Sequence, residues 1–220
     1  MSNVSGLLPQ PRSLRIMLVD DHLSVRQGLR ALFQSVPNAR IVHEAADGDA
    51  AIAAVRTVAP DILVVDLSMP RRNGLSLMRQ LRYMRGQIKI IVLSRYREAA
   101  YVREAFQAGA RGYVLKQSSF EELRRAIDAV LQGQHYFDAA LAPQLGKAAA
   151  GDTESMVSDR EREVLRRAAL GYANKEIGEL LDIAVKTVEA HKSNAMRKLG
   201  LGSRHHLIRY AAFQGWFDEA

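Results

Sequence analysis

The chain has 220 residues, 48% hydrophobic and 25% charged, a composition typical of a globular protein with a substantial core. It contains no cysteine, which excludes disulfides, zinc–thiolate sites and thiol nucleophiles. No apolar run approaches the roughly 18 residues of a membrane span, and residues 1–13 lack the features of a secretory signal. We therefore expect a cytoplasmic protein with no membrane partner, built from one large or two ordinary domains.

Positive charge is unevenly distributed along the chain. The formal net charge is +7, but residues 152–220 are neutral overall, with 11 basic and 11 acidic residues. Within that segment, residues 183–220 hold six basic and three acidic side chains. A basic region of this kind permits nucleic-acid binding without establishing it.

Residues 14–133 alternate between short Val/Ile-rich runs and stretches with helical apolar spacing. The runs predict strands over 14–19, 40–45, 61–66, 89–94 and 112–115, and the stretches predict helices over 23–35, 49–58, 74–84, 98–107 and 119–132. We expect Ser118 or Ser119 to cap the last of these helices. Five such units predict a doubly wound, flavodoxin-like α/β domain with a five-stranded parallel sheet.

The alternation ends at Gly133. We expect residues 134–155 to form a linker, with a short helix within 136–145, because "GKAAAGDTES" is small and polar. Residues 156–220 form a second, all-α domain in this interpretation. Ser158 and Glu161 make a capping box before "DREREVLRRAAL". The helices "NKEIGELL" and "VKTVEAHKSNAMRKL" follow, separated by "DIA", and this spacing is typical of a helix-turn-helix.

Residues suited to phosphate chemistry follow the predicted strands. Asp20 and Asp21 end the first strand, Asp66 the third, Ser94 the fourth and Lys116 the fifth. The carboxyl ends of parallel strands meet at one edge of a sheet, where ligands bind. Clustered carboxylates invite a divalent cation such as Mg²⁺, and a carboxylate can attack phosphorus while a lysine neutralises the developing charge. A single strand-end aspartate is usually an ordinary turn residue, but five such groups predict a phosphoryl acceptor.

These segments resemble the receiver domain of two-component response regulators, on "VDD", "DLSMP..NG", "VLS" and "YVLK". The resemblance implies that Asp66 is the phosphoacceptor. It also implies that Mg²⁺ is held by Asp21 directly, by Asp20 through water, by Asp66 and by the backbone carbonyl of Ser68. Lys116 is the phosphate-binding lysine, and Ser94 and Tyr113 are the switch pair whose hydroxyl and ring follow the phosphate.

The C-terminal helices resemble the LuxR-type helix-turn-helix module, on "REREVL", "G..NKEI...L.I...TVE.H" and "KLG..SR..L..YA". Together the two modules resemble the NarL/FixJ class of response regulators. The resemblance places helix 185–199 in the DNA major groove. Its core face is expected to be Val188, Ala195 and Leu199, with Ile183. The expected DNA-binding residues are Lys186, Thr187, Glu189, Lys192, Ser193, Arg197, Lys198 and Arg204.

Two positions depart from the family pattern. Ala173 and Ala184 stand at N-cap sites where the family usually has Ser or Thr, and alanine there costs about 0.5–2 kcal/mol. We expect Asn174 to take over the first cap, and DNA affinity to depend more on dimerisation.

The function indicated is a transcription regulator, not an enzyme. It would accept a phosphoryl group from a partner histidine kinase, dimerise and bind double-stranded DNA. The helices at 98–107 and 119–132 are candidate dimer faces. The alternatives are a phosphate-independent regulator with a vestigial acid pocket, a phosphatase of the haloacid-dehalogenase type, and a stand-alone adaptor. The phosphatases carry an acid two residues after the nucleophile, where this chain has Ser68.

Overall fold

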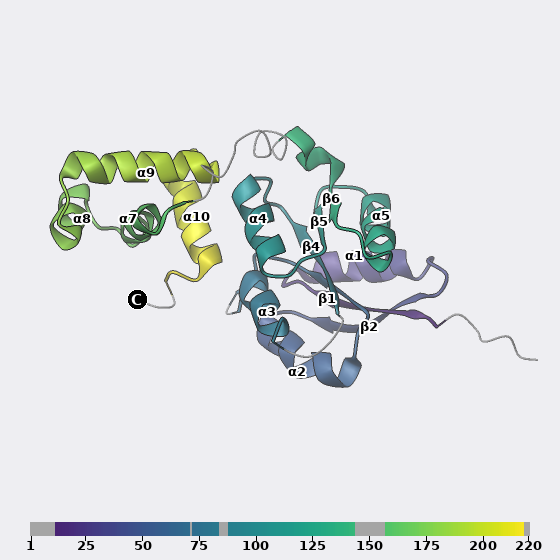
Figure 1. The fold of residues 1–220 in the computed structure, drawn as a ribbon. Coiled ribbons are helices and arrows are strands. Elements are labelled where there is room, and N and C mark those ends of the chain that lie inside the picture. The colour runs from purple at the N-terminus through teal and green to yellow at the C-terminus, as the bar shows by residue number, and fades with distance from the viewer. Residues whose placement is uncertain (1–11, 71, 84–87, 144–156, 218–220) are drawn as a thin grey trace, which may run out of the picture.

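The computed structural model describes residues 12–70, 72–83, 88–143 and 157–217 (Figure 1). An all-parallel sheet forms the first domain, in the strand order β2-β1-β3-β4-β5-β6. Its strands are β1 (Leu14–Val19), β2 (Ala39–Ala45), β3 (Ile62–Val65), β4 (Lys89–Ser94), β5 (Gly112–Leu115) and β6 (Tyr136–Phe137). The predicted doubly wound α/β fold is confirmed.

Alternate residues of each strand enter two separate cores. Met17 and Val65 point to one face, where they pack with α2 (Gly48–Val58), α3 (Gly74–Leu81) and α4 (Ala99–Gln107). Leu18 and Val64 point to the other face, covered by α1 (Leu23–Phe33) and α5 (Phe120–Leu131). Figure 1 shows the helices on the two sides of the sheet. Because both faces are covered, the strands read as continuous apolar runs.

The predicted helices exist, but several ends differ. The helix expected over 74–84 ends at Leu81, and the one expected over 23–35 ends at Phe33. Ser119 occupies the N-cap position of α5 but makes no side-chain capping bond. Ser118 donates its hydroxyl to Asp138 instead. The prediction that one of these serines caps the helix through its side chain is therefore wrong.

A sixth strand was not predicted. β6 has only two residues and pairs with β5. It is followed by a 3-10 turn, Ala139–Leu141, after which residues 142–143 are helical; the rest of the short helix expected within 136–145 lies outside the described residues. Asp138 caps this turn by accepting the Ala140 N–H. Residues 144–155 of the predicted linker lie outside the described residues.

The second domain contains α7 (Asp159–Ala169), α8 (Asn174–Leu181), α9 (Val185–Leu199) and α10 (Arg204–Gln214). The capping box of Ser158 and Glu161 is present, as predicted. The turn between α8 and α9 packs closely on α8: a Cβ at Gly178 would lie 2.8 Å from the carbonyl oxygen of Ile183. Asp182 closes α8 in the left-handed region, with φ 51°.

One hydrophobic cluster runs from the sheet into the second domain. The core that includes Met17 and Tyr101 continues through Tyr210 and Phe213 to Val188. The two domains therefore meet at α4 and α10, which lie side by side in Figure 1. None of the helices in the described ranges is long and apolar enough to cross a membrane.

Candidate functional site

Acidic side chains gather at the carboxyl edge of the sheet. A ligand atom from each of Asp20, Asp21, His22 and Asp66 lies within 4.8 Å of the others. Asp20 and Asp66 are almost fully buried, with 4% and 2% of their surface exposed. The structure thus brings together the three acids that the sequence placed on two different strand ends.

The ammonium group of Lys116 joins two of these acids. Its Nζ lies 2.8 Å from Oδ2 of Asp66 and 2.7 Å from Oδ2 of Asp20. Lys116 is held over the acids because β5 ends beside β4 and the Lys116 N–H donates to the carbonyl of Ser94. Two buried carboxylates are costly without a compensating cation, and Lys116 supplies one positive charge between them.

Asp66 is also held by the loop that follows β3. The backbone N–H of Ser68 donates to Asp66 Oδ1 at 3.1 Å. A Cβ at Gly74 would lie 2.2 Å from the carbonyl oxygen of Asp66, so the start of α3 can approach the site only with glycine there. Asn73 caps α3 by accepting the Ser76 N–H. The "NG" of the sequence is therefore part of the architecture that positions Asp66.

The environment of Asp66 raises the pKa of its carboxyl group. Burial raises the pKa of the Asp66 carboxyl group, and the charge of Asp20 acts in the same direction. The hydrogen bond and positive charge of Lys116, and the N–H of Ser68, partly offset this rise. A bound cation would favour the carboxylate further.

Two residues at this edge were missed by the sequence interpretation. His22 Nδ1 lies 2.6 Å from Asp21 and 3.2 Å from Asp20. Asp138 accepts the Leu115 N–H at 2.9 Å and the Ser118 hydroxyl at 2.5 Å. It therefore fixes the turn that carries Lys116. His22 could have been predicted as part of the cluster because it directly follows Asp21 in the sequence. No feature of the sequence around Asp138 indicates its role.

Ser94 and Tyr113 lie together next to Lys116. Both are fully buried, and the Tyr113 hydroxyl donates to the backbone carbonyl of Tyr96 at 2.9 Å. Burial raises the pKa of Tyr113, and the neighbouring Ser94 side chain partly offsets the rise. Ser94 Oγ accepts the Tyr96 N–H at 3.2 Å. The predicted switch pair is thus one hydrogen-bonded unit with Tyr96.

The second candidate surface lies on α9. Val188, Ala195 and Leu199 are buried, as predicted. A shallow hollow beside this buried face is lined by Asn174, Glu189, Lys192, Ser193, Met196, Arg197 and Leu201. The side chains of Lys186 and Thr187 at the start of α9, and of Arg204 at the start of α10, are exposed. These residues can reach a ligand laid along the helix.

Lys198 differs from the other predicted DNA-binding residues. Its Nζ lies 2.9 Å from Glu161 Oε2, an ion pair that joins α9 to α7. Burial alone would raise the pKa of Glu161, but the bonds from Lys198 and Ser158 lower it. In this structure Lys198 therefore stabilises the second domain. To contact DNA as predicted, Lys198 would have to break its ion pair with Glu161 or bind Glu161 and DNA together.

Ala173 and Ala184, at the N-cap positions of α8 and α9, make no side-chain capping bonds because alanine has no polar side-chain atom. Asn174 does not replace the first cap: it is the first residue of α8, and its amide lies 3.5 Å from Glu189. That expectation is wrong. Glu176 instead accepts the Ala173 N–H at 2.6 Å, which satisfies one backbone donor at this helix start.

Comparison with known families matches two segments of the chain. Residues 16–128 match the response regulator receiver domain, and residues 155–211 match the LuxR family of bacterial regulatory proteins. The oxygen regulatory protein NreC of Staphylococcus aureus (strain MRSA252) is 37% identical over 209 residues, which cover 90% of this chain and 96% of NreC.

Solved structures of RcsB from Salmonella are similar over both domains. RcsB bound to a promoter in the presence of phosphomimetic BeF3⁻ has a TM-score of 0.82 at 29% identity, covering 92% of this chain and 99% of that one. A "crossed" form of an RcsB variant has a TM-score of 0.59 at 28% identity, covering 91% and 99%. At nearly equal identity and coverage, this chain therefore superposes better on the promoter-bound form than on the crossed form. The chain belongs to the NarL-type response regulators, with a receiver domain followed by a LuxR-type DNA-binding domain.

Proposed function

We propose that this response regulator is a transcription regulator switched by phosphorylation of Asp66, with a partner histidine kinase as the phosphoryl donor. One observation carries the proposal: the buried Asp66 carboxylate lies 2.8 Å from Lys116, within a cluster of three acids at the sheet edge. An aspartate that only forms a turn needs neither the Lys116 ammonium group nor the neighbouring carboxylates. The same cluster argues against a vestigial pocket, since all its chemical groups are in reach of one another.

The acid cluster suits Mg²⁺, which prefers oxygen ligands. Asp21, Asp20, Asp66 and the Ser68 carbonyl would hold it, and the ion would neutralise charge on the incoming phosphoryl group. An Asp66 oxygen attacks phosphorus, the bond from phosphorus to the donor breaks, and an acyl phosphate forms. Lys116 stabilises the charge on the phosphoryl oxygens. The Ser94 hydroxyl donates to one of them.

The output of this switch is DNA binding through α9. RcsB is described as bound to a promoter, and dimers of RcsB as bound to DNA. A dimer of this chain would bind two half-sites separated by about 10 bp, roughly one helical turn. Of the two candidate dimer helices, α4 already packs against α10. The dimer interface is therefore better placed on α5, where Glu121, Arg124 and Arg125 are exposed. We place the protein in the cytoplasm, and its only reaction would be its own phosphotransfer and dephosphorylation.

The experiment that tests this function maps the phosphoryl group. The protein is incubated with acetyl phosphate and Mg²⁺, the acyl phosphate is trapped, and the modified residue is identified by mass spectrometry. We expect modification of Asp66, its loss in Asp66→Asn, and its retention in Asp128→Asn, which changes an exposed carboxylate on α5. Modification of Asp20 or Asp21, or undiminished labelling of Asp66→Asn, would overturn the assignment.

A further inference from the structure

Aromatic side chains form a buried junction between the two domains. Tyr101 of α4 is fully buried, and Tyr210 and Phe213 of α10 are nearly so. The Tyr101 ring centroid lies 4.7 Å from that of Phe213 and 5.7 Å from that of Tyr210. These distances are typical of attractive aromatic pairs. The domains are thus packed against each other and not merely tethered.

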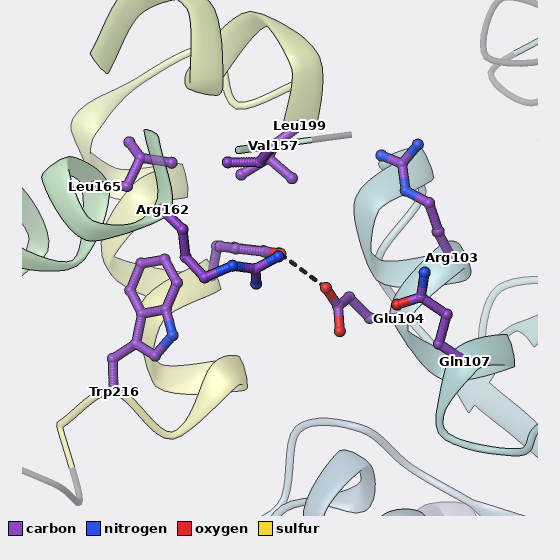
Figure 2. A pocket seen from close by; sticks show the side chains of 9 residues that line it. Arg103, Glu104, Gln107, Val157, Arg162, Leu165, Leu199 and Trp216 are labelled. Carbon is purple, nitrogen blue, oxygen red and sulfur yellow. Dashed lines mark hydrogen bonds between the residues drawn. The ribbon is translucent and has the colours of Figure 1, made fainter. Parts of the chain in front are cut away.

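Polar contacts surround this aromatic centre. Tyr210 donates to Glu104 at 3.3 Å, and Arg209 donates to Glu98 at 3.3 Å. Figure 2 shows Glu104 of α4 pointing toward Arg162 and Trp216 of the second domain. A small cavity of about 50 Å³ lies there, and Arg103 also lines it. That volume holds a few water molecules. A junction with a polar edge of this kind can open and close more readily than a wholly apolar one.

Tyr96 connects this junction to the switch pair. Its N–H donates to Ser94 Oγ and its carbonyl accepts the Tyr113 hydroxyl. Its ring stacks on Tyr101 with a centroid distance of 4.0 Å. The guanidinium carbon of Arg209 lies 5.4 Å from the centre of the same ring. One residue is therefore bonded to both switch residues through its backbone and to the DNA-binding domain through its ring.

A second loop beside Asp66 holds the end of the same helix. Asn73, which follows Asp66 in the β3–α3 loop, donates its side-chain amide to the Phe213 carbonyl at 3.1 Å and to the Ala212 carbonyl at 3.4 Å. The last carbonyls of a helix lack partners within the helix. Asn73 supplies such a partner for α10. The β3–α3 loop, through Asn73, and the β4–α4 loop, through Tyr96, therefore both contact the final turn of α10.

We propose that α10 acts in cis as a positive regulator of the phosphorylation site, with Tyr96 as the positioning residue that transmits its effect. While the junction is formed, Tyr96 gives the buried Tyr113 hydroxyl its acceptor and fixes Ser94 Oγ by its N–H. A serine hydroxyl that accepts this bond still has its own proton for a phosphoryl oxygen. Opening the junction frees Tyr96 and leaves the buried Tyr113 hydroxyl without this partner, which is unfavourable.

The sign of this effect follows from what the junction covers. The residues of α9 predicted to read DNA, such as Lys186, Glu189 and Ser193, remain exposed while α10 packs on α4. The junction therefore does not block the DNA-reading face. It holds the β3–α3 and β4–α4 loops of the receiver domain in a single arrangement. Such preorganisation strengthens binding of a phosphoryl group at Asp66, because the loops lose less conformational freedom when it binds.

The inference rests on the proposed function, and beryllofluoride tests it without DNA or dimerisation. The affinity of the full-length protein for beryllofluoride with Mg²⁺ is measured at concentrations where it is monomeric. We expect Tyr96→Ala and Phe213→Ala to weaken this affinity by about fivefold or more, the low end of coupling between two sites. Tyr96→Phe keeps the ring and the backbone bonds, so it should bind as the wild type does.

Two further variants separate the junction from general stability. Asn73→Asp keeps the oxygen that caps α3 but loses the donor to the Phe213 carbonyl, and should weaken beryllofluoride binding. Ile208→Ala changes an exposed residue of α10 outside these contacts and should have no effect. If the junction variants bind like Ile208→Ala, or more tightly than the wild type, the proposal is overturned. A wild type that binds no beryllofluoride would overturn the proposed function itself, and this inference with it.

Discussion

Replacing Asp138 with asparagine tests whether this buried carboxylate fixes the turn that carries Lys116, beside the acid cluster. Asp138 is 3% exposed and accepts bonds from Leu115 N–H, Ser118 Oγ–H and Ala140 N–H. Asparagine offers one acceptor oxygen, so its amide group would face at least one of these donors. An unmet buried donor costs about 1–3 kcal/mol, and the remaining bonds lose their charge assistance. We expect Asp138→Asn to lower the free energy of unfolding by about 2 kcal/mol.

Calorimetry of the full-length protein measures this loss. For a domain of the receiver's size, about 2 kcal/mol corresponds to a fall in Tm on the order of 5–10 °C. Asp128→Asn is the matched control, because it makes the same change at an exposed position of α5. Amide exchange at Leu115 should accelerate in Asp138→Asn alone. If both variants lower Tm equally, Asp138 does not fix the turn and our interpretation of its bonds is wrong.

Three further changes test other parts of the account. Gly74→Ala would place a Cβ 2.2 Å from the Asp66 carbonyl oxygen. We expect a loss of about 1–3 kcal/mol and much slower acetyl-phosphate labelling, and normal labelling would contradict the tight approach. The lowered pKa of Glu161 means that its ion pair with Lys198 stabilises the second domain above pH 4.5, its ordinary pKa, and that this contribution is lost as pH falls through the lower folded value. Glu161→Gln should therefore be less stable than the wild type at pH 7, by about 1–3 kcal/mol, and nearly equal in strong acid, as followed by tryptophan fluorescence. Glu189→Ala should lose about 1–3 kcal/mol of discrimination at one base pair of a selected site, and an equal gain in affinity for all sequences would show that this side chain is only repelled by phosphate.

The acid cluster could be located from the sequence because each of its residues follows a strand. Strand ends on one edge of a parallel sheet are neighbours whatever the helices between them do. This is why Asp20, Asp66 and Lys116 could be placed together before their distances were known. The two-residue strand β6 and the buried Asp138 could not, since a run this short has no period and an aspartate after it looks like a turn residue.

The domain junction was also beyond the sequence. Tyr101 has the spacing of an ordinary core residue of α4, and Phe213 that of one in α10. No local pattern states that the two rings meet, because their contact depends on how two separately folded domains pack. The cap expected from Asn174 failed for a local reason: α8 begins at Asn174, so the N-cap position falls on Ala173.

We propose above that phosphorylation of Asp66 controls DNA occupancy through the second domain. The most direct measurement is fluorescence anisotropy of the full-length protein on a selected DNA site, with and without beryllofluoride and Mg²⁺, for the wild type and Asp66→Asn. We expect beryllofluoride to tighten DNA binding of the wild type and to leave the DNA affinity of Asp66→Asn unchanged. Equal affinity of the wild type with and without beryllofluoride, or the same increase in Asp66→Asn, would contradict it.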